Sequence, residues 1–134
     1  MKGDAGMASV RRPHVLCVDD EPVTLRLVSR ILEDVGMDPE SAGDPVAALA
    51  TFDGGSFDLV LTDIRMPGMN GFQLARELCQ LRPDVSIVLM SSFEINKEEF
   101  NKVLPSTEVA AFITKPISKN LLLDTVGALF VDGR

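Results

Sequence analysis

Side chains suited to phosphate chemistry stand where short apolar runs of the sequence end. In chain order they are Asp19, Asp20, Asp63, Ser91 and Lys115. Two carboxylates about 4 Å apart repel by roughly 4 kcal/mol at an effective dielectric constant of about 20, so three carboxylates gathered in one crevice require a cation. Hard oxygen donors of this kind favour Mg²⁺, which keeps some of its waters and binds one or two carboxylates together with a phosphate oxygen. If the fold brings these residues together, the sequence predicts a magnesium-dependent phosphate site.

Asp63 is the candidate for the reacting residue. A carboxylate can attack phosphorus and form an aspartyl phosphate when positive charge stabilises the transferring group. Lys115 would supply a movable point charge to the phosphate oxygens, and Ser91 would supply a hydroxyl donor. Each residue also has a structural alternative: Asp63 could form a turn, and Lys115 could be a solvated lysine. The acidic run Asp19, Asp20 and Glu21 could only favour a helix N-terminus. The hypothesis therefore depends on their joint arrangement.

The elements that would position these residues follow from hydrophobic periodicity and turn signals. Strands are expected at about 14–18, 37–42, 59–61, 85–90 and 109–113. Helices are expected at about 22–35, 45–53, 71–81, 96–104 and 119–129. Five strands that alternate with five helices indicate a parallel sheet covered by helices on both faces.

The first expected helix shows the periodicity most clearly. Pro22 suits its first turn and Gly36 follows its end. The apolar residues expected on its buried face are Leu27, Val28, Ile31, Leu32 and Val35.

Pro39 constrains the order of the strands. Proline cannot donate a hydrogen bond to a sheet ladder, so the second strand should lie at an edge. Right-handed crossovers then favour the order 2-1-3-4-5, that of a flavodoxin-like (βα)5 doubly wound α/β fold. In this order the chain reverses direction between the first and third strands. Asp19, Asp20 and Asp63 should therefore meet beyond the carboxyl ends of these strands, where such sheets bind ligands.

Composition describes a single globular domain. The chain has 134 residues, of which 46% are hydrophobic and 25% are charged. No apolar run approaches the roughly 20 residues of a membrane span, and no signal peptide opens the chain, so the cytoplasm is the expected location. The formal net charge of -7, with no cluster of Lys and Arg, argues against direct binding to nucleic acid. We expect a flexible arm at 1–12, one folded domain at 13–131 and a short tail at 132–134.

Three separated motifs extend the pattern beyond single residues. They are VLCVDDEP at 15–22, LTDIRMPGMNG at 61–71 and TKP at 114–116. Together they resemble the receiver domain of two-component response regulators. The resemblance is in register with all five expected strands and covers about residues 13 to 130.

The resemblance implies that Asp63 accepts a phosphoryl group from a sensor histidine kinase or a phosphotransfer protein. It implies Mg²⁺ as the cofactor, held by the carboxylates of Asp19, Asp20 and Asp63 and by the main-chain carbonyl of Arg65. Lys115 would contact the phosphoryl group. A protein of this kind catalyses only its own phosphorylation and dephosphorylation, so we do not expect a free-standing turnover enzyme.

The resemblance also implies a switch. Ser91 would move toward the phosphate, with Ser92 as the competing choice, and Phe112 would turn inward. The Lys115–Pro116 bond would be cis. The fourth helix, fifth strand and fifth helix would form the reporting surface, through which the protein could form a homodimer or contact a partner or output domain.

Two other functions stay open from the residues alone. One is a magnesium-dependent phosphatase with an aspartate nucleophile, although such enzymes usually carry a second aspartate two residues later, where this chain has Arg65. The other is an interaction module that keeps the fold and works without phosphorylation.

Overall fold

The computed structural model describes residues 12–92 and 109–130, which contain a five-stranded parallel sheet. The strands are β1 (His14–Val18), β2 (Asp38–Ala42), β3 (Leu59–Asp63), β4 (Ser86–Ser91) and β5 (Ala111–Thr114). Their order is β2-β1-β3-β4-β5, which confirms the predicted flavodoxin-like order.

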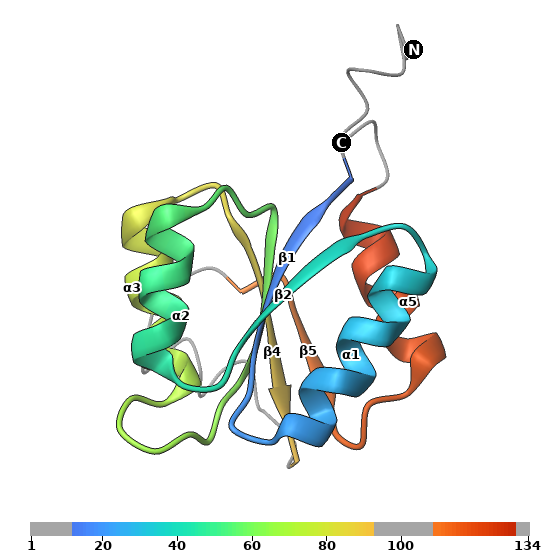
Figure 1. Cartoon of the computed structure of the whole chain (residues 1–134), viewed down its shortest axis with the longest axis horizontal. Helices are drawn as coiled ribbons and strands as arrows, with labels where there is room; N and C mark the ends of the chain where they lie inside the picture. Colours follow the sequence, from blue (N-terminus) through green and yellow to red (C-terminus); the bar gives the residue numbers. More distant parts are fainter. Residues whose placement is uncertain (1–11, 93–108, 131–134) are drawn as a thin grey trace, which may run out of the picture.

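Helices cover both faces of this sheet. The described helices are α1 (Pro22–Asp34), α2 (Pro45–Gly54), α3 (Gly71–Leu81) and α5 (Lys119–Leu129). Figure 1 shows α2 and α3 on one face and α1 and α5 on the other, with the sheet between them. The fourth helix expected at 96–104 lies outside the described residues. None of the described helices is long and apolar enough to cross a membrane.

The core has two apolar layers, one on each face of the sheet. Alternate side chains of β1 contribute to both: Leu16 and Val18 pack on the α2 and α3 side, whereas Val15 and Cys17 pack on the α1 and α5 side. β3 is buried along its whole length. The strand that carries Asp63 is therefore held on both faces by packed side chains.

Two details at the periphery follow from the same packing. β2 forms the edge that Pro39 predicted, and most of its residues are accessible to solvent. The apolar face predicted for α1 is partly wrong, because Leu27 and Val35 are exposed. Val35 lies beyond the last turn as the C-cap, and Leu25, in place of Leu27, packs against the core beside Val28 and the other buried residues of the helix.

Local hydrogen bonds fix where the helices begin. The side chain of Asp44 accepts a hydrogen bond from the Ala47 N–H at the start of α2, and Ser118 caps α5 as predicted. Asn70 and Gln73 form a reciprocal capping box at the start of α3. These caps set the angles at which the chain leaves the carboxyl edge of the sheet.

Gly71 brings α3 against the end of β3. Its N–H donates a hydrogen bond to the Ile64 carbonyl oxygen over 2.7 Å. A Cβ atom at this position would lie 2.8 Å from the Ile64 Cα and would also collide with the carbonyl group of Asp63. The backbone that carries Asp63 thus keeps its position only if residue 71 has no side chain.

We expect Gly71→Ala to lower the free energy of unfolding by about 2 kcal/mol, a typical cost of an atom forced into a packed site. Urea denaturation measures this change. Gly127→Ala is the matched control, since a Cβ there meets nothing within 4 Å and alanine is the better helix former. Equal stability of the two variants would contradict the role of Gly71.

Candidate functional site

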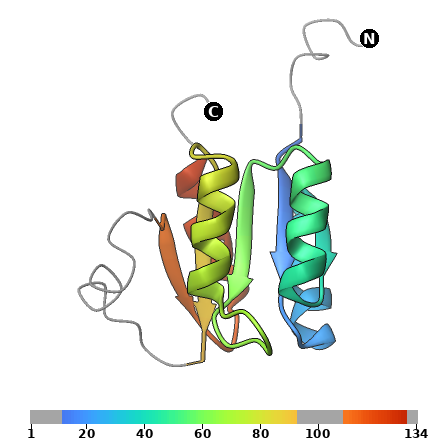
Figure 2. The same cartoon turned by 90° about the vertical axis from the view of Figure 1, so that its left-hand side faces the viewer.

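The carboxyl ends of the strands gather the predicted residues at one edge of the sheet. Asp19 and Lys115 directly follow β1 and β5, while Asp63 and Ser91 are the last residues of β3 and β4. Figure 2 shows these strands running in the same direction, so that their ends come together. A backbone hydrogen bond of 2.6 Å from the Lys115 N–H to the Ser91 carbonyl oxygen ties the ends of β4 and β5.

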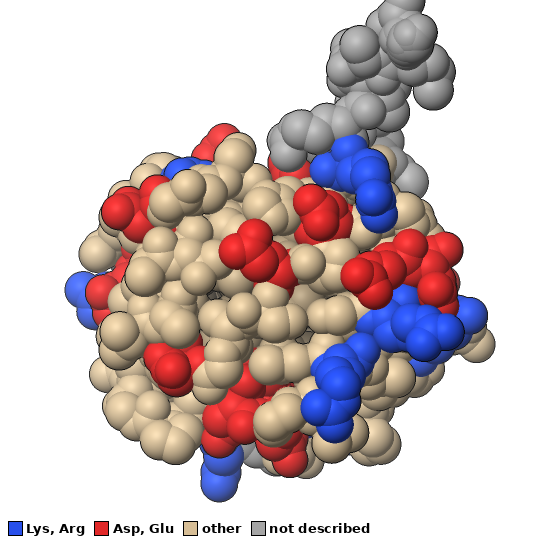
Figure 3. Space-filling view, in the orientation of Figure 1, with Lys and Arg blue, Asp and Glu red and all other residues tan. Residues whose placement is uncertain are grey.

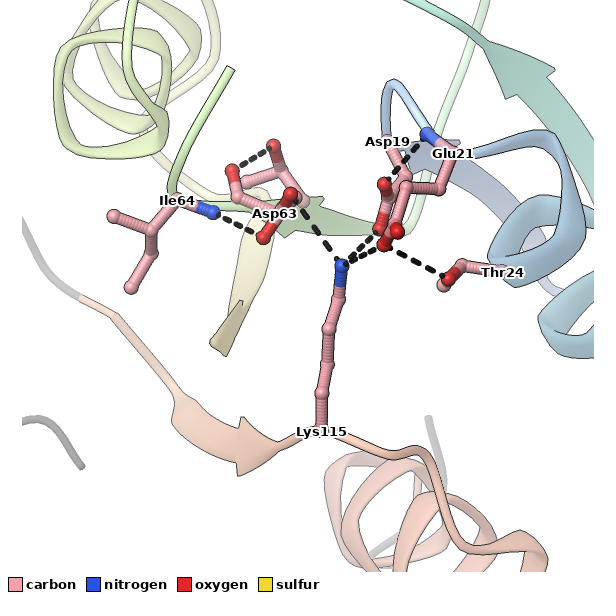
Figure 4. A network of polar contacts seen from close by, with 7 residues as sticks. Asp19, Glu21, Thr24, Asp63, Ile64 and Lys115 are labelled. Atoms are coloured by element: carbon pink, nitrogen blue, oxygen red, sulfur yellow. Dashed lines mark hydrogen bonds and ion pairs between the residues drawn. The ribbon is translucent and has the colours of Figure 1, made fainter. Parts of the chain in front are cut away.

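The ammonium group of Lys115 lies at the centre of this edge. Its Nζ atom is 2.8 Å from Asp19 Oδ2, 3.1 Å from Glu21 Oε1 and 3.4 Å from Asp63 Oδ2. In Figure 4 the lysine side chain extends from the end of β5 and ends between Asp63 on one side and Asp19 and Glu21 on the other. One cation therefore joins two carboxylates from the loop between β1 and α1 and one from the end of β3.

Asp63 is buried, and its two oxygens have different surroundings. Oδ1 accepts a hydrogen bond from the Ile64 N–H over 2.9 Å, whereas Oδ2 faces Lys115. Burial raises the pKa of Asp63, and the negative charge of Asp19 raises it further. The charge of Lys115 and the two hydrogen-bond contacts oppose this shift without cancelling it.

At Lys115, the charged contacts outweigh the effect of burial on the pKa. Burial alone would lower the pKa of its ammonium group, but the contacts with Asp19 and Glu21 and the charge of Asp63 outweigh burial and raise the pKa above its usual range. The lysine therefore stays positively charged at neutral pH and acts as the cation of the site.

Asp19 carries the clearest sign of a cation site. Oδ1 accepts a hydrogen bond from the Glu21 N–H over 2.9 Å, whereas Oδ2 is buried and has no hydrogen-bond partner among the described residues. The Lys115 ammonium, 2.8 Å away, compensates this oxygen as an ion pair. A buried carboxylate oxygen of this kind is costly unless a positive charge lies beside it.

A divalent cation fits the same residues. One carboxylate oxygen each from Asp19, Asp20 and Asp63 lies within 4.8 Å of the others. Asp20 is exposed, which leaves its carboxylate accessible from solvent, while Asp19 and Asp63 are buried. Three hard oxygen donors, one of them without a hydrogen bond, are the set expected for Mg²⁺.

The remaining predicted residues lie around this centre. Ser91 is buried, Ser92 is exposed, and Phe112 is partly buried against the core layer beneath α2 and α3. Arg65 is exposed in the loop after β3. The Lys115–Pro116 peptide bond is cis. The roles expected of Arg65, Ser91 and Phe112 remain predictions.

Glu21 is a member of this site that was not predicted from the sequence. This residue directly precedes α1, yet its carboxylate contacts a lysine 94 positions later in the chain. The only sequence signal was the third acidic residue in the run Asp19-Asp20-Glu21.

We expect Asp63→Asn to raise the free energy of unfolding by about 1 kcal/mol at neutral pH in metal-free buffer, because it removes a buried charge that repels Asp19. A carboxyl whose pKa is higher in the folded state than in the unfolded chain costs stability at neutral pH, and this cost disappears as the pH falls. The difference between the variant and the wild type should therefore shrink toward pH about 4 in urea denaturation. A less stable variant at neutral pH would contradict the electrostatic account.

Comparisons with known proteins agree with this geometry. The family model described as "Response regulator receiver domain" matches residues 15–127. Among curated proteins, the chain is 34% identical to the sensor histidine kinase GacS of Pseudomonas protegens over 123 residues, which cover 88% of this chain and 13% of that protein. It is 38% identical to the putative two-component response regulator ARR21 of Arabidopsis thaliana over 112 residues, covering 82% of this chain and 18% of that protein. The chain thus spans less than a fifth of either relative.

Solved structures show the same fold. The chemotaxis protein CheY4 of Vibrio cholerae superposes with a TM-score of 0.80 at 27% identity, covering 89% of this chain and 99% of that one. The response regulator TrrA of Thermotoga maritima, solved in complex with Mg(2+)-BeF, has a TM-score of 0.77 at 29% identity, covering 87% of this chain and 98% of that one. With a family match over most of its length and the acidic site at the expected edge of the sheet, the chain belongs to the response regulator receiver domain family of two-component systems.

Proposed function

We propose that this receiver domain accepts a phosphoryl group on Asp63 from a phosphohistidine of a sensor histidine kinase or a phosphotransfer protein. The observation that carries the proposal is the placement of a buried carboxylate 3.4 Å from a charged lysine and beside two further aspartates. This arrangement combines a nucleophile with the positive charge that phosphoryl transfer needs.

The transfer replaces the phosphorus–nitrogen bond of the donor with a phosphorus–oxygen bond to Asp63. A carboxylate oxygen of Asp63 attacks phosphorus while the bond from phosphorus to the donor imidazole nitrogen breaks. The imidazole nitrogen keeps the electron pair of that bond and takes a proton from solvent water. Because Oδ1 of Asp63 already accepts the Ile64 N–H, Oδ2 is the oxygen in position to attack, and the nearby Lys115 ammonium would stabilise the charge that develops on the phosphoryl oxygens. Attack by water on the acyl phosphate would release inorganic phosphate and restore Asp63.

The proposed cofactor is Mg²⁺. Asp19, Asp20 and Asp63 would hold it, together with the main-chain carbonyl of Arg65. When bound, the cation would supply the second positive charge that neutralises the phosphoryl oxygens. The protein's own part is to keep these carboxylates at the ends of rigid strands and to keep the site partly shielded from water.

Phosphorylation would then shift the equilibrium between two conformers of the domain. A phosphoryl group adds nearly two negative charges and favours the conformer in which Ser91 and Lys115 reach it. Phe112 lies in β5, three residues before Lys115, so a movement of its side chain would change the surface along this edge strand of the sheet. We propose the surface of β5 and α5, together with the fourth helix expected at 96–104, as the contact for a second copy, a partner or an output domain.

Intact mass after incubation with acetyl phosphate and Mg²⁺ tests the acceptor. We expect the wild type to gain one phosphoryl group and Asp63→Asn to gain none, because only residue 63 offers the nucleophile. Asp53→Asn, which changes an exposed aspartate of α2, is the matched control and should gain the group like the wild type. If Asp63→Asn gained a phosphoryl group, another residue would be the acceptor.

Calorimetric titration with Mg²⁺ tests the metal ligands. We expect Asp20→Asn to weaken binding by about tenfold, equivalent to about 1.4 kcal/mol, since it removes one hard oxygen ligand. Asp20 is exposed, so its substitution should not disturb the core. Asp38→Asn, an exposed aspartate at the far end of β2, should bind like the wild type. Equal affinities for the two variants would remove Asp20 from the site.

A further inference from the structure

Lys115 and the proposed metal use overlapping sets of carboxylates. The ammonium contacts Asp19, Glu21 and Asp63, whereas the group that can hold a metal is Asp19, Asp20 and Asp63. Two of the three residues are common to both sets. Glu21 belongs only to the set around the lysine, and Asp20 belongs only to the set that can hold a metal.

Within residues 12–92 and 109–130, the Glu21 carboxylate contacts Lys115 and, at a longer distance, the Thr24 hydroxyl. Glu21 occupies the N-cap position of α1, but its side chain makes no capping hydrogen bond. The Glu21 backbone N–H donates a hydrogen bond to Asp19 Oδ1, and any residue except proline could donate the same bond. Its carboxylate instead contacts Lys115 over 3.1 Å, and the Thr24 hydroxyl lies 3.5 Å from the same oxygen (Figure 4).

We propose that Glu21 is a positioning residue that holds Lys115 in the resting site, so that Mg²⁺ must displace the lysine from Asp19 and Asp63 before the site can accept a phosphoryl group. This inference rests on the proposed metal site. The two cations repel each other at short range, so Mg²⁺ on Asp19 and Asp63 disfavours the position of the ammonium group beside the same two carboxylates. The carboxylate of Glu21 favours the arrangement in which the lysine occupies that position.

Glu21 also adds a negative charge near the metal, which favours metal binding. The two effects oppose each other, so a single substitution cannot separate them. A double-mutant cycle does, because the field of Glu21 acts on the metal in every background, whereas its hold on the lysine exists only where Lys115 is present.

The experiment is calorimetric titration of Mg²⁺ into four proteins: wild type, Glu21→Gln, Lys115→Met and the double variant. In the Lys115→Met background we expect Glu21→Gln to weaken binding by about threefold, the effect of one solvent-exposed charge. In the presence of Lys115 the same substitution should leave the affinity unchanged or tighten it. Equal weakening in both backgrounds would overturn the inference and leave the metal site intact. Absence of Mg²⁺ binding by the wild type would instead overturn the proposed metal site and the inference with it.

A second measurement does not use Lys115→Met, whose folding is at risk because two buried carboxylates lose their cation. In metal-free protein, NMR of the Lys115 ammonium group reports how fast its protons exchange with water. We expect Glu21→Gln to speed this exchange by about threefold or more, as expected for loss of one charged contact. Glu33→Gln, an exposed glutamate of the same helix, is the matched control and should leave the rate unchanged. An unchanged rate in Glu21→Gln would show that Glu21 does not hold the lysine.

Discussion

The site depends on the compensation of buried negative charge by one ammonium group. Asp19 and Asp63 are both buried, and one oxygen of Asp19 has no hydrogen bond. Without a cation these two carboxylates would repel each other in a medium that screens charge poorly. Lys115 lies within 3.4 Å of both, so it offsets their repulsion and lets them lie close together. The negative charge of the two carboxylates exceeds the single positive charge of the lysine, which is why we propose that the site binds a second cation.

The fold supplies the rigidity that this arrangement needs. β1 and β3 are central strands with apolar side chains packed on both faces, and each delivers one carboxylate at its end. Gly71 lets α3 pack against the backbone of Asp63, and the Asn70 and Gln73 cap fixes where that helix begins. Figure 3 shows Lys and Arg side chains gathered on the α1 side of the molecule, beside separate groups of Asp and Glu. This face of the molecule therefore carries both kinds of charge, although the net charge of the chain is -7.

The sequence predicted most of the fold because its signals were local and consistent. Pro39 placed β2 at the edge, and the apolar runs placed the strand ends to within a few residues. Lys115 and the aspartates could be expected to meet, since parallel strands bring their carboxyl ends to one edge. Periodicity misplaced Leu27 because the buried stripe of α1 is narrower than the run of apolar residues. The contact between Glu21 and Lys115 could not be predicted, because it depends on the side-chain path of a residue 94 positions away.

The most direct test of the account is a crystal structure of the chain with Mg²⁺ and beryllofluoride, whose fluorines stand for the oxygens of a phosphoryl group. The account predicts beryllium bonded to an oxygen of Asp63, the metal on Asp19 and Asp20, and the Lys115 ammonium on a fluorine and away from Glu21. A structure in which Lys115 still joins Asp19 and Glu21, with beryllofluoride absent from Asp63, would contradict the central claim that this site exchanges its lysine for a metal and a phosphoryl group.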